Sequence, residues 1–254
     1  MSVLDDIVAA KRKRLDRGEY GPVSPPAPAG DGAAFVASLR QPGIRIVAEI
    51  KQRSPSAGEI LQGAEGKIET IALAYRRGHA AALSVVVEED FFGGKPSWLP
   101  RAKSRSGLPA LLKDFIVSER QLDFAVSLGA DAVLLIVRAL SDQELAALRE
   151  GARSRNLAAV VEAHGAEEVA RAAAVKPDVL GVNARDLSTF ATSLDSLEAI
   201  GKSLPPEPVR MAESGVRTRA DVARLGAAGY GAFLVGESLL RSENPEEALR
   251  ELRS

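Results

Sequence analysis

The sequence predicts an α/β fold, a TIM-type (β/α)8 barrel of parallel strands with an extra helix at its N-terminus. Eight short apolar runs typical of buried strands alternate along the chain with segments of helical periodicity. Charged residues end several of these runs, and barrels of parallel strands gather their functional groups at such carboxyl ends. An open doubly wound sheet is the alternative. However, no Gly-x-Gly-x-x-Gly turn follows the first run, so dinucleotide binding has little support.

A helical segment and a linker precede the barrel. Residues 2–15 are predicted to form an amphipathic helix, because apolar residues recur at helical spacing and acids precede bases, as the helix dipole favours. Residues 21–32 are rich in proline, glycine and alanine, which predicts an irregular linker. We expect one barrel domain over residues 1–254, with residues 1–32 as its N-terminal extension and the helix covering one end.

The strands and helices follow in order. Helix start signals lie between several runs: Ser118-Glu119-Arg120-Gln121 and Ser141-Asp142-Gln143-Glu144 fit capping boxes, and Asn244 precedes a first-turn Pro245. The eight runs predicted to be strands are residues 45–50, 82–87, 110–113, 132–136, 158–162, 179–182, 209–212 and 232–235.

Composition narrows the class of protein. A formal net charge of −1 gives no reason to expect a nucleic-acid or anionic-membrane partner, and no run is long enough to cross a bilayer. The chain has no cysteine, which excludes disulfides, a thiolate nucleophile and cysteine metal ligands. No His, Asp and Glu set has metal-ligand spacing, so no metal is implied. We expect a cytoplasmic protein, a monomer, that acts on a small molecule.

Three charged residues close predicted strands, namely Lys51, Lys113 and Glu162. Two ammonium groups and a carboxylate in such places suggest acid/base chemistry on an anionic small molecule. Glu49 stands two residues before Lys51, so both side chains share a face. We expect the pKa of Lys113 to be lowered by apolar walls and a second ammonium group, which would suit it to donate a proton near neutrality. Taken singly, these residues also fit exposed ion pairs, a snorkelling lysine or a helix-cap carboxylate.

Polar and small residues follow the last three predicted strands. Asn183 can hydrogen-bond substrate oxygens, and Arg185 can bind a carboxylate through two parallel bonds or else pair with Asp186. The turns Ser214-Gly215 and Gly236-Glu237 each lead into a probable helix start, where backbone amides bind phosphate well, and the side chain of Glu237 is expected to point away. His164 could orient Glu162, but we expect it to pack behind the site or at the surface, and we expect Trp98 to pack as an anchor.

Taken together, these segments resemble the indole-3-glycerol-phosphate synthase family of the tryptophan pathway. The resemblance is ordered, spans nearly every predicted strand and is more specific than any single motif. It is carried by Leu4-Asp5-Asp6-Ile7-Val8-Ala9-Ala10-Lys11, Ala48-Glu49-Ile50-Lys51, Ser54-Pro55-Ser56-Ala57-Gly58, Leu112-Lys113-Asp114-Phe115, Gly129-Ala130-Asp131-Ala132, Val161-Glu162-Ala163-His164, Asn183-Ala184-Arg185-Asp186-Leu187, Ala212-Glu213-Ser214-Gly215 and Val235-Gly236-Glu237-Ser238-Leu239.

The resemblance implies a carboxy-lyase that uses no cofactor. It would close the pyrrole ring of 1-(2-carboxyphenylamino)-1-deoxyribulose 5-phosphate with loss of carbon dioxide and water. Lys113 would be the general acid at the ketone, Glu162 the base in the later dehydration, and Lys51 a stabiliser of developing charge. Glu49 and Asn183 would position these groups. The implied substrate-binding residues are Ser54 and Arg185 at the carboxylate, Ser214, Gly215, Gly236 and Glu237 at the phosphate, and also Phe115 and Glu213.

The chain departs from the family pattern at four positions. Val87 and Ala184 replace a frequent threonine and asparagine, Lys95 replaces a usual serine, and Glu237 replaces the small residue of some members. Two other functions are open. A phosphoribosylanthranilate isomerase would be expected to use a cysteine, which is absent. A non-catalytic phosphosugar-binding barrel would not need Lys51, Lys113 and Glu162.

Overall fold

The strands form one closed parallel barrel. The computed structural model describes residues 2–22, 24, 26–185 and 191–254. Neighbouring strands run in the order β1-β10-β9-β8-β7-β6-β5-β4, and β1 pairs with β4 to close the ring. The predicted barrel is confirmed, and each predicted strand agrees with the structure to within one residue. The strands are β1 (Arg45–Ile50), β4 (Ala82–Val86), β5 (Ala110–Lys113), β6 (Ala132–Ile136), β7 (Ala158–Ala163), β8 (Val179–Asn183), β9 (Val209–Glu213) and β10 (Ala232–Val235).

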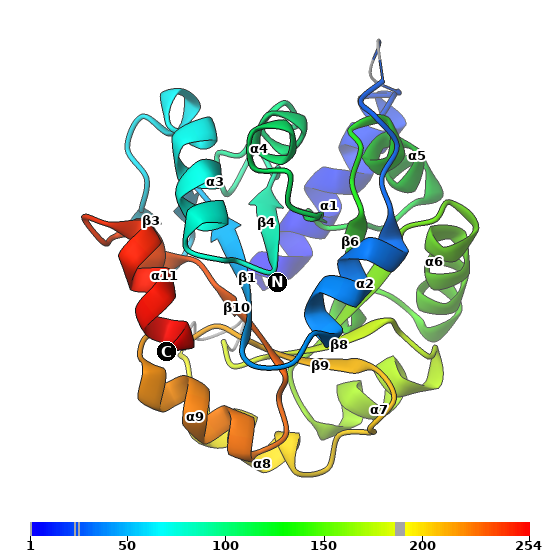
Figure 1. The fold of residues 1–254 in the computed structure, drawn as a ribbon. Helices are drawn as coiled ribbons and strands as arrows, with labels where there is room; N and C mark the ends of the chain where they lie inside the picture. The colour runs from blue at the N-terminus through cyan, green and yellow to red at the C-terminus, as the bar shows by residue number, and fades with distance from the viewer. Residues whose placement is uncertain (1, 23, 25, 186–190) are drawn as a thin grey trace.

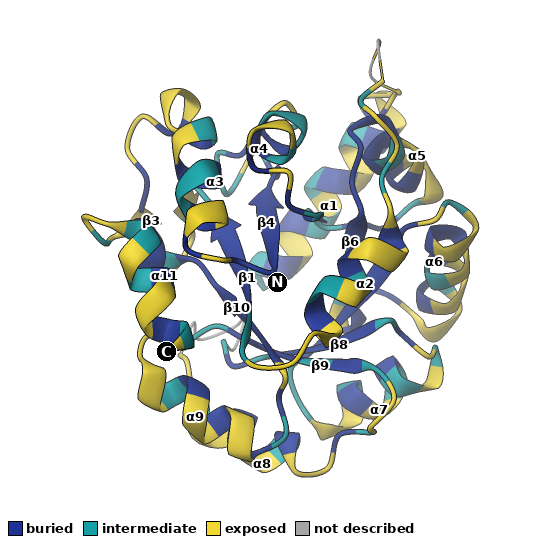
Figure 2. Ribbon diagram, viewed as in Figure 1, coloured by how far each residue is buried: buried dark blue, intermediate teal, exposed yellow. Residues whose placement is uncertain are grey.

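Helices surround the barrel, and their inner faces are buried against it while their outer faces are exposed (Figure 2). Their apolar residues pack with the outward side chains of the strands in a single large cluster, in which Trp98 is fully buried, as expected. The helices around the ring are α3 (Ile68–Arg77), α4 (Trp98–Ser106), α5 (Glu119–Ser127), α6 (Asp142–Ser154), α7 (Ala166–Ala174), α8 (Leu194–Gly201), α9 (Arg219–Ala227), α10 (Glu237–Leu240) and α11 (Pro245–Arg253).

Two N-terminal helices lie at opposite ends of the barrel. In Figure 1, α2 (Gly32–Arg40) lies in front of the strands and α1 (Val3–Asp16) lies behind them. The buried Phe35 and Leu39 of α2 join the interior cluster with residues at the amino ends of the strands. Helix α1 packs at the carboxyl end, where its first turns face a cavity. The helix predicted over residues 2–15 therefore exists, and a second helix closes the other end.

Helices begin at all three predicted starts, with Ser118, Ser141 and Asn244 as N-caps. Ser141 and Glu144 make a reciprocal capping box, and Asn244 caps the helix that begins at Pro245. The Ser118 side chain caps α5 by accepting from Arg120 N, but the reciprocal contact from Gln121 that a capping box requires is absent. The Gln121 side chain instead accepts from Val117 N at 2.9 Å and donates to Phe115 O at 2.8 Å. This buried amide satisfies the loop after β5, which a capping contact could not do at the same time.

The barrel interior has an apolar floor and a charged upper layer. Inward side chains alternate along each strand, so Val47 in β1 lies below Glu49, and Leu111 in β5 lies below Lys113. The outward neighbours Ile46, Ala48 and Ile50 belong to the other cluster. Because every second side chain of a strand points inward, the charged residues at the strand ends extend into the mouth of the barrel.

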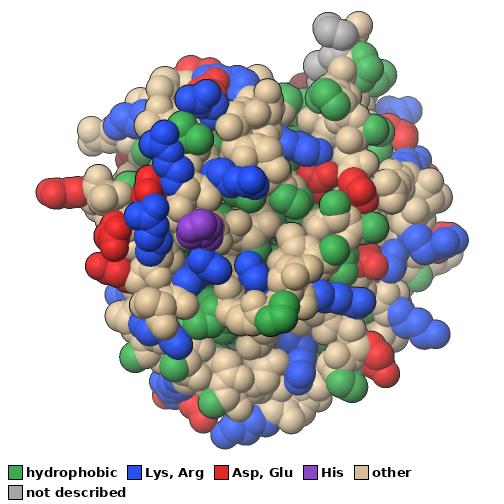
Figure 3. All heavy atoms as spheres, in the orientation of Figure 1, with side chains coloured by type: hydrophobic (Ala, Val, Ile, Leu, Met, Phe, Trp, Pro, Cys, Tyr) green, Lys and Arg blue, Asp and Glu red, His purple; other side chains and the backbone are tan. Residues whose placement is uncertain are grey.

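The described surface offers few further clues to function. Acidic and basic side chains are both present over the face in Figure 3, in keeping with the near-zero net charge. Among the helices that the structure describes, none has the length and apolar character required to span a bilayer.

Candidate active site

A cavity of about 450 Å³ opens at the carboxyl ends of the strands. This volume falls within the range of small-molecule sites, roughly 300–1,000 Å³. All thirteen residues predicted as catalytic or substrate-binding line it, and they lie on or after six of the eight barrel strands: Glu49, Lys51, Ser54, Lys113, Phe115, Glu162, Asn183, Arg185, Glu213, Ser214, Gly215, Gly236 and Glu237. The geometry therefore brings the predicted residues together, while their roles stay predictions.

The centre of the cavity floor is an ammonium group between buried carboxylates. Lys113 Nζ donates to Glu213 Oε2 at 2.6 Å and lies 3.3 Å from Glu162 Oε2. The two glutamates are 1% and 3% exposed in their side chains, whereas Lys113 is 17% exposed and faces the opening. Lys113 thus connects β5 with β7 and β9 and presents its ammonium group to any molecule in the cavity.

A second ion pair lies beside the first, on β1. Lys51 Nζ donates to Glu49 Oε1 at 2.5 Å, so the two side chains share a face as predicted from their spacing. Glu49 is buried, and its other oxygen lies 3.5 Å from the Ser84 hydroxyl of β4. A side chain at Gly236 would lie 2.8 Å from Glu49 Oε1, so this turn of β10 needs glycine.

The predicted lowering of the Lys113 pKa is wrong. Burial does favour the neutral amine, but the carboxylates of Glu213, Glu162 and Glu49 together outweigh burial and raise the pKa of Lys113. The sequence placed Lys113 beside apolar walls and Lys51, and it gave no sign that Glu213 would be the closest neighbour. Lys113 is therefore a cation in the free protein, and it holds its proton more tightly than an exposed lysine does.

The two carboxylates that share Lys113 differ in their acidity. Burial and repulsion from Glu162 raise the pKa of Glu213 to about 7, against the attraction of Lys113. Burial also acts on Glu162, but Lys113, His164 and the Asn183 amide hold the pKa of Glu162 below its ordinary value. One site thus holds an ionised carboxylate next to a carboxyl that titrates near neutrality, the arrangement expected where proton transfer is needed.

Groups on β7 and β8 hold Glu162 in place. Asn183 Nδ2 donates to Glu162 Oε1 at 3.1 Å, while Asn183 Oδ1 accepts from the Arg185 backbone amide. His164 is buried, with its Nε2 3.4 Å from Glu162 Oε1 and its Nδ1 3.1 Å from Glu168 Oε2. His164 therefore packs behind the site, one of the two expected places, whereas its contact with a second carboxylate was not expected.

A short hairpin that the sequence did not predict follows β1. Strands β2 (Arg53–Ser54) and β3 (Gly58–Glu59) pair antiparallel and carry the serine-rich turn over the cavity. Arg185 Nη1 donates to the Ser56 hydroxyl at 3.0 Å, and the Ser54 and Ser56 hydroxyls lie 3.3 Å apart. The alternative pairing of Arg185 with Asp186 concerns a residue outside the described part of the chain.

The turns after β9 and β10 line the same cavity. Ser214 and Gly215 both have a positive φ, 66° and 82°, and serine adopts this conformation only at a cost. Gly236 directly precedes α10, and the side chain of Glu237 accepts from Arg241 Nε at 3.1 Å, one helical turn further along. The Glu237 carboxylate therefore has a cationic partner of its own.

The cavity also has walls that the sequence did not predict. Phe92 was not predicted, and its ring centroid lies 5.9 Å from that of the predicted Phe115. Amphipathic spacing alone could not show that Val3, Leu4 and Ile7 of α1 face a ligand site instead of the core. Arg217 and Arg241 add positive charge near the turns after β9 and β10.

Of the four residues that depart from the family pattern, one lines the cavity and three do not. Val87 and Ala184 are buried in the apolar cluster around the strands, and Lys95 pairs with Glu65 on the surface at 2.9 Å. Glu237 lines the cavity. Within the described residues, no three His, Asp or Glu side chains are placed to hold a metal ion.

Comparisons with known proteins identify the family of the chain. The family model described as indole-3-glycerol phosphate synthase matches residues 5–252. The chain belongs to the indole-3-glycerol phosphate synthase family. A relative of that name from Micrococcus luteus is 41% identical over 100% of this chain and 98% of its own. Relatives from Acidithiobacillus ferrooxidans and Geobacillus thermodenitrificans are each 39% identical over 98% of this chain, and the match covers 98% and 96% of their lengths.

A solved structure adds evidence on the fold alone. Thiamine phosphate pyrophosphorylase from Pyrococcus furiosus superposes with a TM-score of 0.60 at 18% identity, covering 86% of this chain and 96% of that one. The indole-3-glycerol phosphate synthase family predicted from the strand-end motifs is thus confirmed by the family match and the near-full-length relatives.

Proposed function

We propose that this chain converts 1-(2-carboxyphenylamino)-1-deoxyribulose 5-phosphate into indole-3-glycerol phosphate, carbon dioxide and water, a step of tryptophan biosynthesis. The observation that carries the proposal is the ammonium group of Lys113, held at the mouth of the barrel between Glu213 and Glu162. Around it, one cavity offers cationic and amide groups for two anions. The substrate has a carboxylate and a phosphate, with a ketone between them.

Arg185 and the serine turn suit the substrate carboxylate. The guanidinium group lies at the hairpin beside the Ser56 hydroxyl, and Ser54 lines the same cavity. Guanidinium groups bind carboxylates through two parallel hydrogen bonds, which also orient the ring that carries the carboxylate. Phe92 and Phe115 would then contact the ring itself.

Backbone amides after β9 and β10 suit the phosphate. The turns Ser214-Gly215 and Gly236-Glu237 follow the last two strands, the usual phosphate position in barrels of this type. Arg241 holds the Glu237 carboxylate and offsets its charge. With its carboxylate and its phosphate both bound, the substrate would lie across the charged layer at the mouth of the barrel.

The first chemical step is ring closure. The aromatic carbon that bears the carboxylate attacks the ketone carbon, and Lys113 donates its proton to the ketone oxygen as negative charge develops there. Loss of carbon dioxide from the attacking ring carbon then returns the electron pair of the broken bond to the ring and restores aromaticity. Lys51, fixed by Glu49, stabilises the developing charge.

The second step is dehydration. The new hydroxyl group takes up a proton from the solvent and leaves as water. The neighbouring carbon loses its proton to Glu162, which is ionised in the free protein and oriented by Asn183. The pyrrole double bond forms with no net oxidation or reduction, so the proposed reaction balances without a cofactor.

The test is turnover of the purified chain with this substrate, followed by indole fluorescence and by release of carbon dioxide. We expect one carbon dioxide per indole product, with the same rate in the presence of a metal chelator. A phosphoribosylanthranilate control should show no conversion. Binding of the substrate without turnover would instead favour the non-catalytic barrel, and conversion of phosphoribosylanthranilate would favour the isomerase.

A further inference from the structure

Helix α1 inserts a charged side chain beneath the rim of the cavity. The side chain of Lys11 is 1% exposed, and its ammonium group lies 2.8 Å from Asp114 Oδ1 and 3.2 Å from Glu88 Oε1. Charged side chains are rarely buried this completely, because removal from water costs more than a single ion pair returns. Packing of α1 against the barrel could be achieved with apolar residues alone, so the buried Lys11 ammonium group between two carboxylates needs a further explanation.

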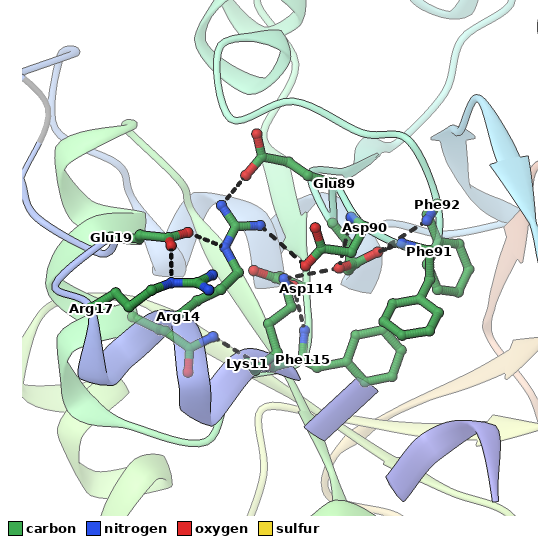
Figure 4. A network of polar contacts seen from close by, with 12 residues as sticks. Lys11, Arg14, Arg17, Glu19, Glu89, Asp90, Phe91, Phe92, Asp114 and Phe115 are labelled. Atoms are coloured by element: carbon green, nitrogen blue, oxygen red, sulfur yellow. Dashed lines mark hydrogen bonds and ion pairs between the residues drawn. The ribbon is translucent and has the colours of Figure 1, made fainter. Parts of the chain in front are cut away.

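Each of the two carboxylates organises a loop at the end of a strand. Glu88, which follows β4, accepts from the backbone amides of Asp90, Phe91 and Phe92 at 3.2, 2.7 and 3.0 Å. Asp114, which follows Lys113, accepts from the Phe115 amide at 2.8 Å. Figure 4 shows Asp114 and these loop residues converging from neighbouring segments beside Lys11.

The two loops present one aromatic surface to the cavity. The backbone amide of Phe92 is bound by Glu88, and that of Phe115 is bound by Asp114. The two phenylalanine rings contact one another. Both rings line the cavity, and the Lys113 side chain emerges next to Asp114. The Lys11 ammonium group is therefore the shared counterion of the two loops that carry the aromatic surface.

A second basic residue of α1 also contacts the loop after β4. Arg14, one turn further along α1, pairs with Glu89 and Asp90 of the first loop and with Glu19 (Figure 4). Arg12 is different, because it pairs with Glu144 on α6 at 3.1 Å, with both side chains well exposed. Helix α1 thus has basic contacts to the cavity loop on one side and an ordinary surface ion pair on another.

We propose that Lys11 is a positioning residue, whose ammonium group holds the loops after β4 and β5 together so that Phe92 and Phe115 form the surface that receives the substrate's aromatic ring. The inference rests on the proposed function for the nature of that ring. It gives Lys11, on the side of α1 that faces the cavity loops, a part in substrate binding, although Lys11 itself touches no substrate. Loss of the charge would leave Glu88 and Asp114 facing one another without a cation, and the two loops would separate.

The test compares Lys11→Met with Arg12→Met, a matched loss of one positive charge from the same helix. Assayed well below the melting temperature, Lys11→Met should raise KM about tenfold, the scale of one lost aromatic contact, with a smaller change in kcat. Arg12→Met should leave both constants unchanged. A Lys11→Met variant that melts earlier but keeps the wild-type KM would show a purely structural role and overturn the proposal.

A second variant covers the case in which Lys11→Met does not fold. Combining Lys11→Met, Glu88→Gln and Asp114→Asn removes every charge from the buried site, and neutral replacements of buried ion networks often fold well. This variant should also show a raised KM, because the link between α1 and the loops is absent. A wild-type KM in the folded triple variant would contradict the proposal.

Amide hydrogen exchange separates this inference from the proposed function, since it needs no substrate. The amides of Phe91, Phe92 and Phe115 should exchange faster in Lys11→Met than in the wild type or in Arg12→Met. If the wild type fails to turn over the substrate, the proposed function falls while the exchange data still decide the role of Lys11. Unchanged protection of these three amides would overturn it.

Discussion

Replacing Glu213 with glutamine should remove a large part of the pH dependence of stability. The folded chain keeps a proton on Glu213 up to a pKa of about 7, whereas the unfolded chain releases it near 4.5. Between these values the folded state binds more protons, so the free energy of unfolding falls as the pH rises through the window. Glutamine cannot ionise, and the variant loses this decline.

The size of the effect follows from the two pKa values. One pKa unit corresponds to about 1.4 kcal/mol, so the difference between 4.5 and about 7 corresponds to about 3 kcal/mol for this fully buried group. The free energy of unfolding of Glu213→Gln, minus that of the wild type, should therefore rise by about 3 kcal/mol between pH 4.5 and pH 8.

Urea unfolding at a series of pH values, followed by circular dichroism, measures this difference. Titrating groups that do not contact the cluster around Glu213 behave alike in both proteins and cancel in the difference. A difference that stays constant from pH 4.5 to pH 8 would refute the reasoning. It would mean that Lys113, 2.6 Å away, keeps Glu213 ionised throughout.

Three further outcomes are expected. Arg185→Ala should mainly raise KM, since a carboxylate contact holds the ground state and the transition state alike, and steady-state kinetics would show the split. Inorganic phosphate should compete with the substrate through the turns at Ser214-Gly215 and Gly236-Glu237, and inhibition that is absent or not competitive would count against this site. Gly181→Ala should lower stability by about 1–3 kcal/mol in thermal unfolding, because its Cβ would lie 2.2 Å from Glu213 Oε1.

Much of the barrel could be predicted because its signals are local. Each strand is a short apolar run, and the period of two then directs Glu49 and Lys51 to the same inward face. The carboxyl ends of parallel strands meet at one end of a barrel, so residues at the ends of distant runs could be placed in a common site without knowledge of any contact.

The rest could not be predicted because it depends on which distant residues meet. Lys113 and Glu213 are 100 positions apart, and the pKa of Lys113 is raised by that contact, whereas the apolar run around it suggested the reverse. Lys11 looked like an ordinary basic residue near the end of a surface helix. Only the packing of α1 over the loops after β4 and β5 shows it to be buried between two carboxylates.

The central claim is that the buried cluster performs acid/base catalysis of ring closure, and kcat of Lys113→Ala and Glu162→Gln tests it most directly. Single-turnover and steady-state assays with the carboxyphenylamino-deoxyribulose phosphate should show that each variant loses on the order of a hundredfold to ten-thousandfold in kcat. Substrate affinity should change much less, and circular dichroism should confirm the fold. Near-normal turnover by a folded Lys113→Ala variant would contradict the account.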